Sequence, residues 1–145
     1  MAERNERAVI NHLIETCRDA EQGFLMAAEY VKNAEMRRLF YRLAEQRHEF
    51  AEELLPQAHR LGGAAETDGT RIAIVHRTWM QLRAQLASNP DRAILAEATR
   101  GEQHAQVAYD EAVQDLLPPD ARELVEAQDL GVRVAGRLVA ALATH

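Results

Sequence analysis

The sequence predicts an all-α protein: a four-helix bundle with a short crossover helix between the second and third long helices. Three observations support this class. The 145 residues are 47% hydrophobic and 28% charged, with seven glycines and four prolines, and the residue types that dominate favour helices. Apolar residues recur with helical spacing through four long segments. The breaks between these segments carry helix start and stop signals. This length fits one domain, which we expect to span residues 1–145.

The first two long helices should form a hairpin. The first is predicted over residues 4–32, and Asn33 is a good N-cap for the second, over 34–61,. The pair Gly62-Gly63 ends the second helix. Because hardly any loop separates the two helices, they should pack antiparallel. Pro56 removes one backbone donor, which predicts a kink or a break late in the second helix.

Three more helices follow, each opened by a turn-rich or capping segment. They are a short helix over 71–87 capped by Thr70, a long helix over 90–117 capped by Asn89 with Pro90 first, and a long helix over 121–143 opened by Pro118, Pro119 and Asp120. The two long helices again need only a tight turn between them, so they form a second antiparallel hairpin.

The connection between the two hairpins determines the topology. The segment from Gly63 to Ser88 is long enough to travel back along the bundle and contains the short helix. One long crossover between two hairpins is typical of the ferritin-like bundle rather than of the simple up-down-up-down form. The second and third long helices should therefore run parallel.

Three carboxylates are expected at one height of this bundle. Glu21 and Glu45 lie equally far from the turn at Asn33, and Glu102 lies equally far from the start of its own helix. Ferritin-like di-metal proteins hold their ions with a Glu from each of two helices and a Glu-x-x-His from each of the other two. Glu45 and His48 have that spacing. An iron or manganese site with Glu21, Glu45, His48 and Glu102 as ligands is therefore one interpretation.

A buried polar layer without a metal is the interpretation that we prefer. Glu45 falls opposite the apolar face of its helix, whereas Arg47 lies near the centre of that face. Glu102 lies within the apolar stripe of the third long helix and Gln128 within that of the fourth, which has no Glu-x-x-His at this height. A guanidinium can neutralise an inward carboxylate and keep it ionised. We therefore expect Arg47, Glu102 and Gln128 to form the layer, flanked by Glu21.

Each of these residues also has a simpler interpretation. Arg47 would snorkel to the surface, and Glu102 would stay solvated at a helix junction. His76 and Trp79 of the short helix are expected to pack the crossover onto the bundle rather than to bind a ligand. Cys17 faces the core and is expected to act as a small inert hydrophobe.

Composition limits the location and the partners. The net charge of −6 and the isoelectric point near 5.5 argue against nucleic acid and anionic membranes as partners. No apolar run approaches the ~20 residues of a membrane span, and no signal peptide is evident, so a cytoplasmic location is expected. A second apolar line on the first helix, formed by Ile10, Ile14 and Leu25, would cover a partner or receive the crossover helix. We expect a homodimer at most.

Five segments together resemble a family of small proteobacterial proteins of unknown function, assigned to the ferritin-like superfamily. The segments are LIETCRDAEQGF, EQRHEFAEEL, VHRTWMQL, ILAEATRGEQ and LPPDARELVEAQ. The resemblance implies a ferritin-like fold and some link with stress. Thr99 and Gly136 stand where the family commonly has an acidic residue and a His, so two potential ligands are missing. We therefore expect a non-catalytic, stress-related or partner-binding protein, with a di-metal oxidase or iron-handling protein as the alternative.

Overall fold

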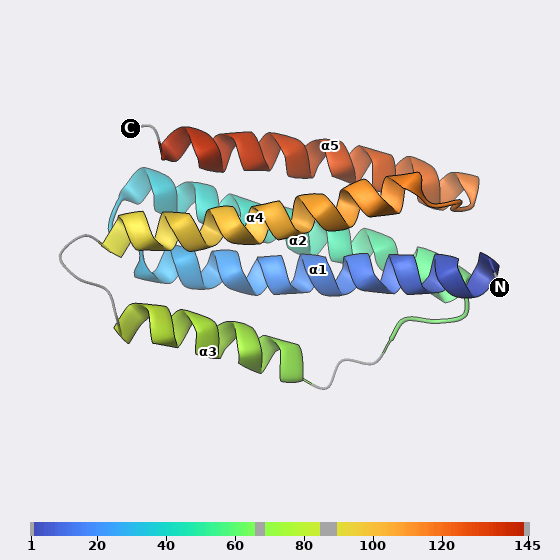
Figure 1. The fold of residues 1–145 in the computed structure, drawn as a ribbon, viewed down its shortest axis with the longest axis horizontal. Coiled ribbons are helices and arrows are strands. Elements are labelled where there is room, and N and C mark those ends of the chain that lie inside the picture. The colour runs from blue at the N-terminus through green and yellow to red at the C-terminus, as the bar shows by residue number, and fades with distance from the viewer. Residues whose placement is uncertain (1, 66–68, 85–89, 144–145) are drawn as a thin grey trace.

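The described part of the chain is entirely helical. The computed structural model describes residues 2–65, 69–84 and 90–143, and in these ranges it contains five helices and no strand. They are α1 (Ala2–Tyr30), α2 (Ala34–Arg60), α3 (Thr70–Ala84), α4 (Pro90–Gln114) and α5 (Pro119–Leu142). The four long helices lie side by side along the molecule and α3 lies outside them (Figure 1). The all-α prediction is confirmed. The predicted cap Asn89 and the end of the crossover helix after Ala84 lie outside the described residues.

The two hairpins are joined so that α2 and α4 run in the same direction, as predicted (Figure 1). The apolar core consists of two clusters. One cluster contains Met36 and Ile94, near the starts of α2 and α4, with Val139 near the end of α5. The other contains Ala58 and Ala112, near the ends of α2 and α4. Residues near the starts of α2 and α4 thus share one cluster, and residues near the ends of these helices share the other, as a parallel arrangement requires.

The crossover helix α3 packs against α1 and α4. Among the side chains described on α3, Trp79 is the one buried hydrophobic residue, whereas Ile72 and Ile74 are exposed. The predicted second apolar line on α1 does not form an outer surface. Its members Ile10 and Ile14 are buried in the core, and Leu25 packs against the other cluster together with side chains of α3.

The helix ends follow the local signals in most cases. The Asn33 side chain accepts a hydrogen bond from the Met36 amide at 2.9 Å, and Gly62 and Gly63 end α2 with positive φ angles, which favour glycine. Of the predicted kink or break near Leu54 and Leu55, the break was wrong, because α2 continues through Pro56 to Arg60, whereas the kink stays a prediction. Pro56 costs the helix a single backbone donor near its end, and buried packing on both sides of it holds the last turns in place,. Among the helices described, none is long and apolar enough to cross a membrane.

Candidate functional site: a buried ion pair at the centre of the bundle

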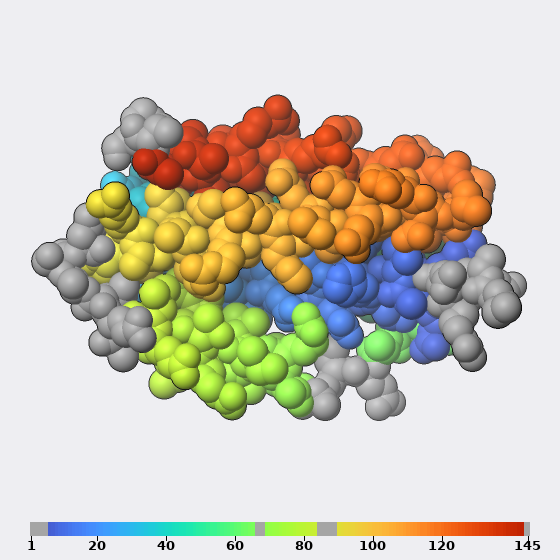
Figure 2. Space-filling view, viewed as in Figure 1, coloured from blue at the N-terminus to red at the C-terminus, as the bar shows by residue number. Residues whose placement is uncertain are grey.

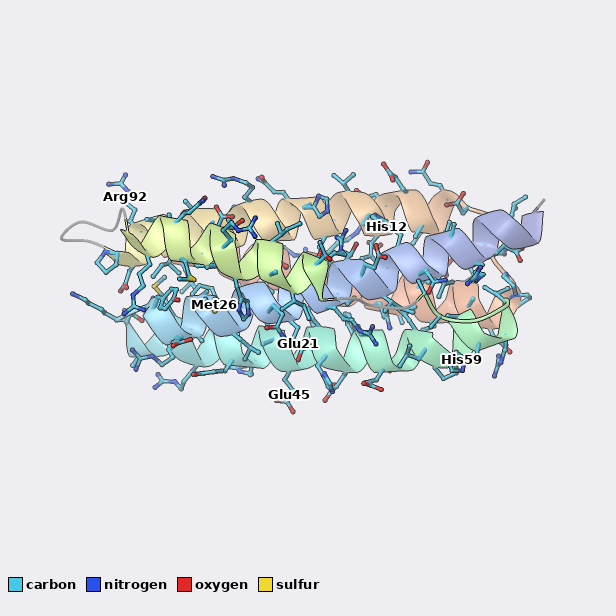
Figure 3. All side chains as sticks on the ribbon, turned by 90° about the horizontal axis from the view of Figure 1, so that it is seen from below. His12, Glu21, Met26, Glu45, His59 and Arg92 are labelled. Carbon is cyan, nitrogen blue, oxygen red and sulfur yellow. The ribbon has the colours of Figure 1, made fainter. Side chains whose placement is uncertain are left out.

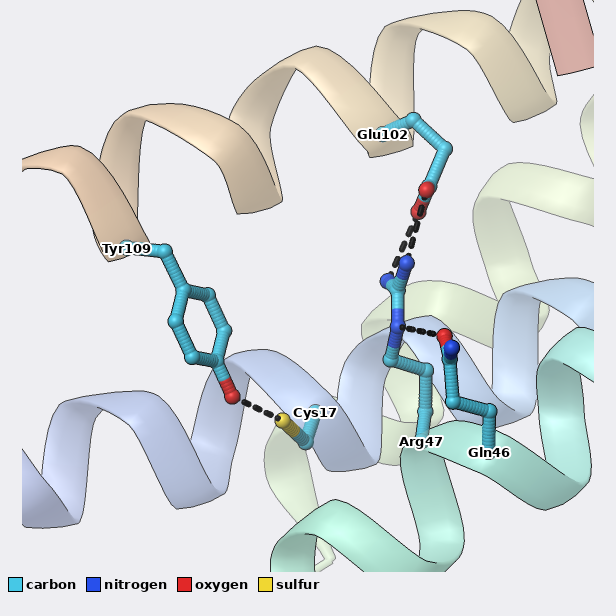
Figure 4. A network of polar contacts seen from close by, with 5 residues as sticks. All are labelled: Cys17, Gln46, Arg47, Glu102 and Tyr109. Carbon is cyan, nitrogen blue, oxygen red and sulfur yellow. Dashed lines mark hydrogen bonds and ion pairs between the residues drawn. The ribbon is translucent and has the colours of Figure 1, made fainter. Parts of the chain in front are cut away.

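The centre of the bundle holds an arginine and a glutamate that are both buried. Arg47 of α2 is 0% exposed and Glu102 of α4 is 3% exposed. The two guanidinium nitrogens Nη1 and Nη2 donate to Oε1 and Oε2 of Glu102, each at 2.7 Å (Figure 4). This is the bidentate geometry in which a guanidinium and a carboxylate interact most strongly. Arg47 therefore does not extend to the surface, and Glu102 is not solvated.

The pair separates the two apolar clusters of the core. On α2, Arg47 follows Ala44 of one cluster and precedes Ala51 of the other. On α4, Glu102 stands in the same way between Ala98 and Ala105. The ion pair therefore forms a polar layer between two apolar halves of the bundle.

Two further side chains complete the surroundings of Arg47. Its Nε donates to Oε1 of the adjacent Gln46 at 3.1 Å, and its guanidinium carbon lies 5.5 Å from the centre of the Phe24 ring, within the range of a cation–π interaction. A charged group out of water needs hydrogen-bond partners for its donors. Gln46 accepts from Nε, the nitrogen of Arg47 that does not bond to Glu102. Gln46 is not among the residues predicted from the sequence, because its helical position lies beside the apolar face and only the length of its side chain brings it in.

The other two members of the predicted layer lie elsewhere. Glu21 lies 3.3 Å from the ring nitrogen Nδ1 of His48, on the surface between α1 and α2. Gln128 is buried as predicted, but its amide contacts Tyr109 and Glu53 rather than the ion pair. Gln128 is thus a buried polar residue of the core, but in the described part of the chain neither it nor Glu21 hydrogen-bonds to the ion pair, because shared height in a bundle does not fix the direction in which a flexible side chain extends.

Gln128 belongs to a second buried network beside the ion pair. The Tyr109 hydroxyl donates to Oε1 of Gln128 at 2.7 Å, and the Gln128 amide donates to the carbonyl of Phe50 and to Glu53. Because the Tyr109 proton is used in this way, its oxygen accepts from the Cys17 thiol, whose sulfur lies 3.1 Å away (Figure 4). The network links α1, α2, α4 and α5.

Burial keeps the Cys17 thiol and the Tyr109 hydroxyl of this network protonated. Burial raises the pKa of the Cys17 thiol to about 11, against the lowering effect of the bond to Tyr109. Burial also raises the pKa of Tyr109 above its ordinary value. An ionised group without water around it would be costly. Cys17 therefore serves as a small hydrogen-bonding core residue, and its thiolate, the reactive form, is suppressed.

Of the four alternative metal ligands, the structure brings only Glu21 and His48 together. Glu45 is exposed and points away from the bundle, whereas Glu21 lies between α1 and α2 (Figure 3). His48 is on the surface beside Glu21, and both carboxylate oxygens of Glu102 face the Arg47 guanidinium. In the ranges that the structure describes, no group of three or more His, Cys, Asp or Glu side chains is placed to hold a metal ion. The residues at the centre thus do not fit a di-metal site, because a cation already occupies the place that the ions would take.

The crossover residues lie against α1. Trp79 is 4% exposed, and the Nε2 nitrogen of the exposed His76 lies 3.2 Å from the side-chain oxygen of Gln22. Trp79 thus provides the buried packing and His76 an outer polar contact.

Comparison with family models assigns the chain to a family. Residues 5–115 match the model described as Domain of unknown function (DUF2383). The chain belongs to this family. Among curated proteins, none matches the sequence.

The DUF2383 match contains the ion pair but only part of the second network. Arg47 and Glu102 lie within residues 5–115, as do Cys17 and Tyr109. Gln128 lies beyond the match, on α5. The segment LPPDARELVEAQ, which contributed to the resemblance, also lies beyond it.

Proposed function

We propose that this protein is a non-catalytic, ferritin-like helical bundle that acts by binding and holds no metal at its centre. The bidentate ion pair between Arg47 and Glu102 is the observation that carries the proposal. In a di-metal bundle the inward carboxylates are neutralised by metal ions. Here the guanidinium neutralises the one inward carboxylate of α4 and donates to both of its oxygens. The parallel course of α2 and α4, with a crossover between them, supports the ferritin-like assignment,.

The proposed mode of binding is self-association through α5. Three large apolar side chains of this helix, Leu130, Val134 and Leu138, are 65%, 49% and 46% exposed. They are spaced four residues apart, so they form one stripe along the helix. A straight stripe of this kind can pair with its own copy about a twofold axis. The proposed dimer contact is therefore on α5 and not on the apolar line of α1, because the residues of that line are covered within the monomer.

Light scattering at several protein concentrations tests the dimer. We expect a dimer mass for the native chain and a monomer mass for the double variant Leu130→Glu, Leu138→Glu. A matched control, Leu116→Glu, changes a leucine outside α5 that is still more exposed and should leave the dimer intact. A native chain that is monomeric at every concentration, or a 24-subunit cage, would contradict this part of the proposal.

The cellular setting is proposed from the resemblance and the composition. We place the protein in the cytoplasm of a bacterium, with a role under stress. Survival of a deletion strain under oxidative and envelope stress, compared with a strain in which the gene is restored, tests that role. Equal survival of the two strains would contradict it.

Titration with Fe(II) and Mn(II) without oxygen, followed by oxygen uptake after air is admitted, tests the metal-free centre. We expect no saturable binding and no oxidation above that of buffer. Glu45→Gln is a matched control, because it removes an exposed carboxylate. Saturable binding that Glu102→Gln abolishes and Glu45→Gln retains would overturn the proposal in favour of an iron-handling protein.

A further inference from the structure

A cavity of about 200 Å³ lies between α1, α3 and α4. It adjoins the centre of the bundle, because Glu102 of the ion pair forms part of its wall. Figure 2 shows the face on which α3 (green) lies along α4 (yellow to orange), with α1 (blue) visible between them. Small residues make the room: Ala20 and Gly23 on α1, and Ala98 and Gly101 on α4.

An unpaired donor lines this cavity. Trp79 is 4% exposed, and its indole Nε1 has no hydrogen-bond partner among the described residues. The nitrogen keeps some contact with solvent, because Asp129 Oδ1 is the one fully enclosed side-chain atom without a partner in the described part of the chain. The nitrogen lies over Gly23, 3.6 Å from where a Cβ of that residue would stand. An indole N–H can only donate, and buried Trp side chains usually find a partner. The cavity therefore offers a hydrogen bond to a ligand acceptor.

A carboxylate that can accept lines the same cavity. Each oxygen of Glu102 accepts one hydrogen bond from Arg47, and a carboxylate oxygen can accept a second. The other two acidic side chains of the wall are also neutralised: Asp19 by Arg71 and Glu97 by Arg100. The wall thus presents the Trp79 donor, the exposed imidazole of His104 and a further acceptor on Glu102. Its acidic side chains are all paired with arginines, which favours a neutral ligand.

The remaining lining is mostly apolar and includes Phe24, Ile74 and Val75. An engineered apolar cavity of ~150 Å³ binds benzene, so this space suits one aromatic ring with a small substituent, or two fused rings. A hydroxyl group on such a ring both accepts and donates a hydrogen bond. We propose that the cavity binds a small uncharged aromatic alcohol, of which phenol is the simplest, with its hydroxyl between Trp79 and Glu102. This site goes beyond the proposed function and does not depend on dimerisation.

The single Trp of the chain gives a direct readout. A proton–nitrogen correlation NMR spectrum should contain one indole resonance, that of Trp79. We expect phenol to shift it progressively to saturation. Toluene has the same shape but a methyl group in place of the hydroxyl. Calorimetry should show phenol binding about fivefold more tightly than toluene, as expected for one net hydrogen bond.

Two variants locate the site. Trp79→Phe keeps an aromatic ring and removes the donor, so the preference for phenol over toluene should fall, because only the hydrogen bond to Glu102 is left. Gly23→Leu places a side chain in the cavity and should abolish the binding of both molecules. Glu29→Leu, an exposed change on the same helix, is the matched control and should bind both like the native chain.

Four results would overturn the proposal. They are an indole resonance that phenol does not shift, equal affinity of the native chain for phenol and toluene, a phenol preference undiminished in Trp79→Phe, and phenol binding retained in Gly23→Leu. Trp79→Phe preserves most of the packing volume, so it decides the question even where Gly23→Leu does not fold. None of these results depends on the oligomeric state or the metal content.

Discussion

The Tyr109 hydroxyl connects three helices through two hydrogen bonds. It accepts from Cys17 of α1 and donates to Gln128 of α5. Its ring is 0% exposed, so water cannot replace either bond. A buried polar atom that loses its partner keeps the cost of its own desolvation.

Removing this hydroxyl should therefore destabilise the fold. We expect Tyr109→Phe to lower the free energy of unfolding by about 1 to 3 kcal/mol, since Gln128 Oε1 is left without its donor. Urea unfolding followed by circular dichroism measures the change. Tyr41→Phe is the control, because Tyr41 is 49% exposed and should change stability very little. Equal stability of the two variants would mean that the network adds nothing to the fold.

The raised pKa of Cys17 predicts a loss of stability at alkaline pH. The pKa rises from 9.0 for an ordinary thiol to about 11 in the folded chain, so the folded state disfavours the thiolate. The contribution of the buried neutral thiol to the free energy of unfolding is fully present below pH 9 and is lost as the pH rises through about 11,. Tyr109 acts in the same direction, because its pKa is also raised.

Unfolding free energies measured across this window test the prediction. Cys17→Ala should lose stability less steeply with pH than the native chain, although it starts from a lower value. The native Cys17 should also react with a thiol reagent only as fast as the protein unfolds. Rapid labelling under native conditions, or parallel pH profiles for the two proteins, would contradict the assigned state of Cys17.

The residues of the ion pair could be predicted, but their companions could not. Arg47 and Glu102 stand on the apolar faces of their helices, and a pattern of helical spacing reveals such residues. Gln46 and Tyr109 gave no comparable signal. A glutamine beside an apolar face is usually solvated, and a tyrosine within one is usually read as packing. Their roles depend on which side chains the other helices bring near.

At the scale of the elements, Asp91 joins the two hairpins at one end of the bundle. It lies in the first turn of α4, and its two carboxylate oxygens accept from the backbone amides of Lys32 and Asn33, at 2.7 and 3.0 Å. These amides belong to the turn between α1 and α2. Hydrogen bonds to a charged acceptor are among the stronger ones. Asp91 thus fixes the start of α4 against the turn of the first hairpin.

We expect Asp91→Ala to lower the free energy of unfolding by about 1 to 3 kcal/mol, because two backbone donors lose a charged acceptor. Glu111→Ala, an exposed change on the same helix, is the matched control. Hydrogen exchange provides a local readout. The amides of Lys32 and Asn33 should exchange faster in Asp91→Ala and at the native rate in Glu111→Ala. Unchanged exchange at both amides would rule out the contact.

The helix boundaries could be predicted where the signal is local. Asn33 and Gly62-Gly63 act within one or two turns of their own positions, so their effects appear in the sequence. Pro56 is also local, but its expected break is overridden by tertiary packing of α2. Asp91 has its partners in the other hairpin, so no pattern along α4 could reveal its function.

At the scale of the whole molecule, the lengths of the connections between helices predict most of the topology. Two tight turns and one long connection require two antiparallel hairpins and leave few courses for the crossover, which is why the parallel order of α2 and α4 could be predicted. The covering of Ile10 and Ile14 could not be decided in the same way. An apolar line suits either a partner or a neighbouring helix, and only the packed structure distinguishes the two.

The central claim is that an ion pair occupies the middle of the bundle and holds its two apolar halves in register. The pair need not be more stable than an apolar pair of similar volume, but either partner alone would be a buried charge without compensation. The cost of removing one partner should thus depend strongly on whether the other is present.

A double-mutant cycle measured by urea unfolding tests this claim most directly. We expect Arg47→Met alone to lose about 3 to 5 kcal/mol, and the double variant Arg47→Met, Glu102→Leu to recover much of that loss. Arg42→Met, an exposed change on the same helix, is the control and should be close to the native chain. If Arg47→Met alone is as stable as the native protein, the arginine does not neutralise Glu102 and the account of the centre is wrong.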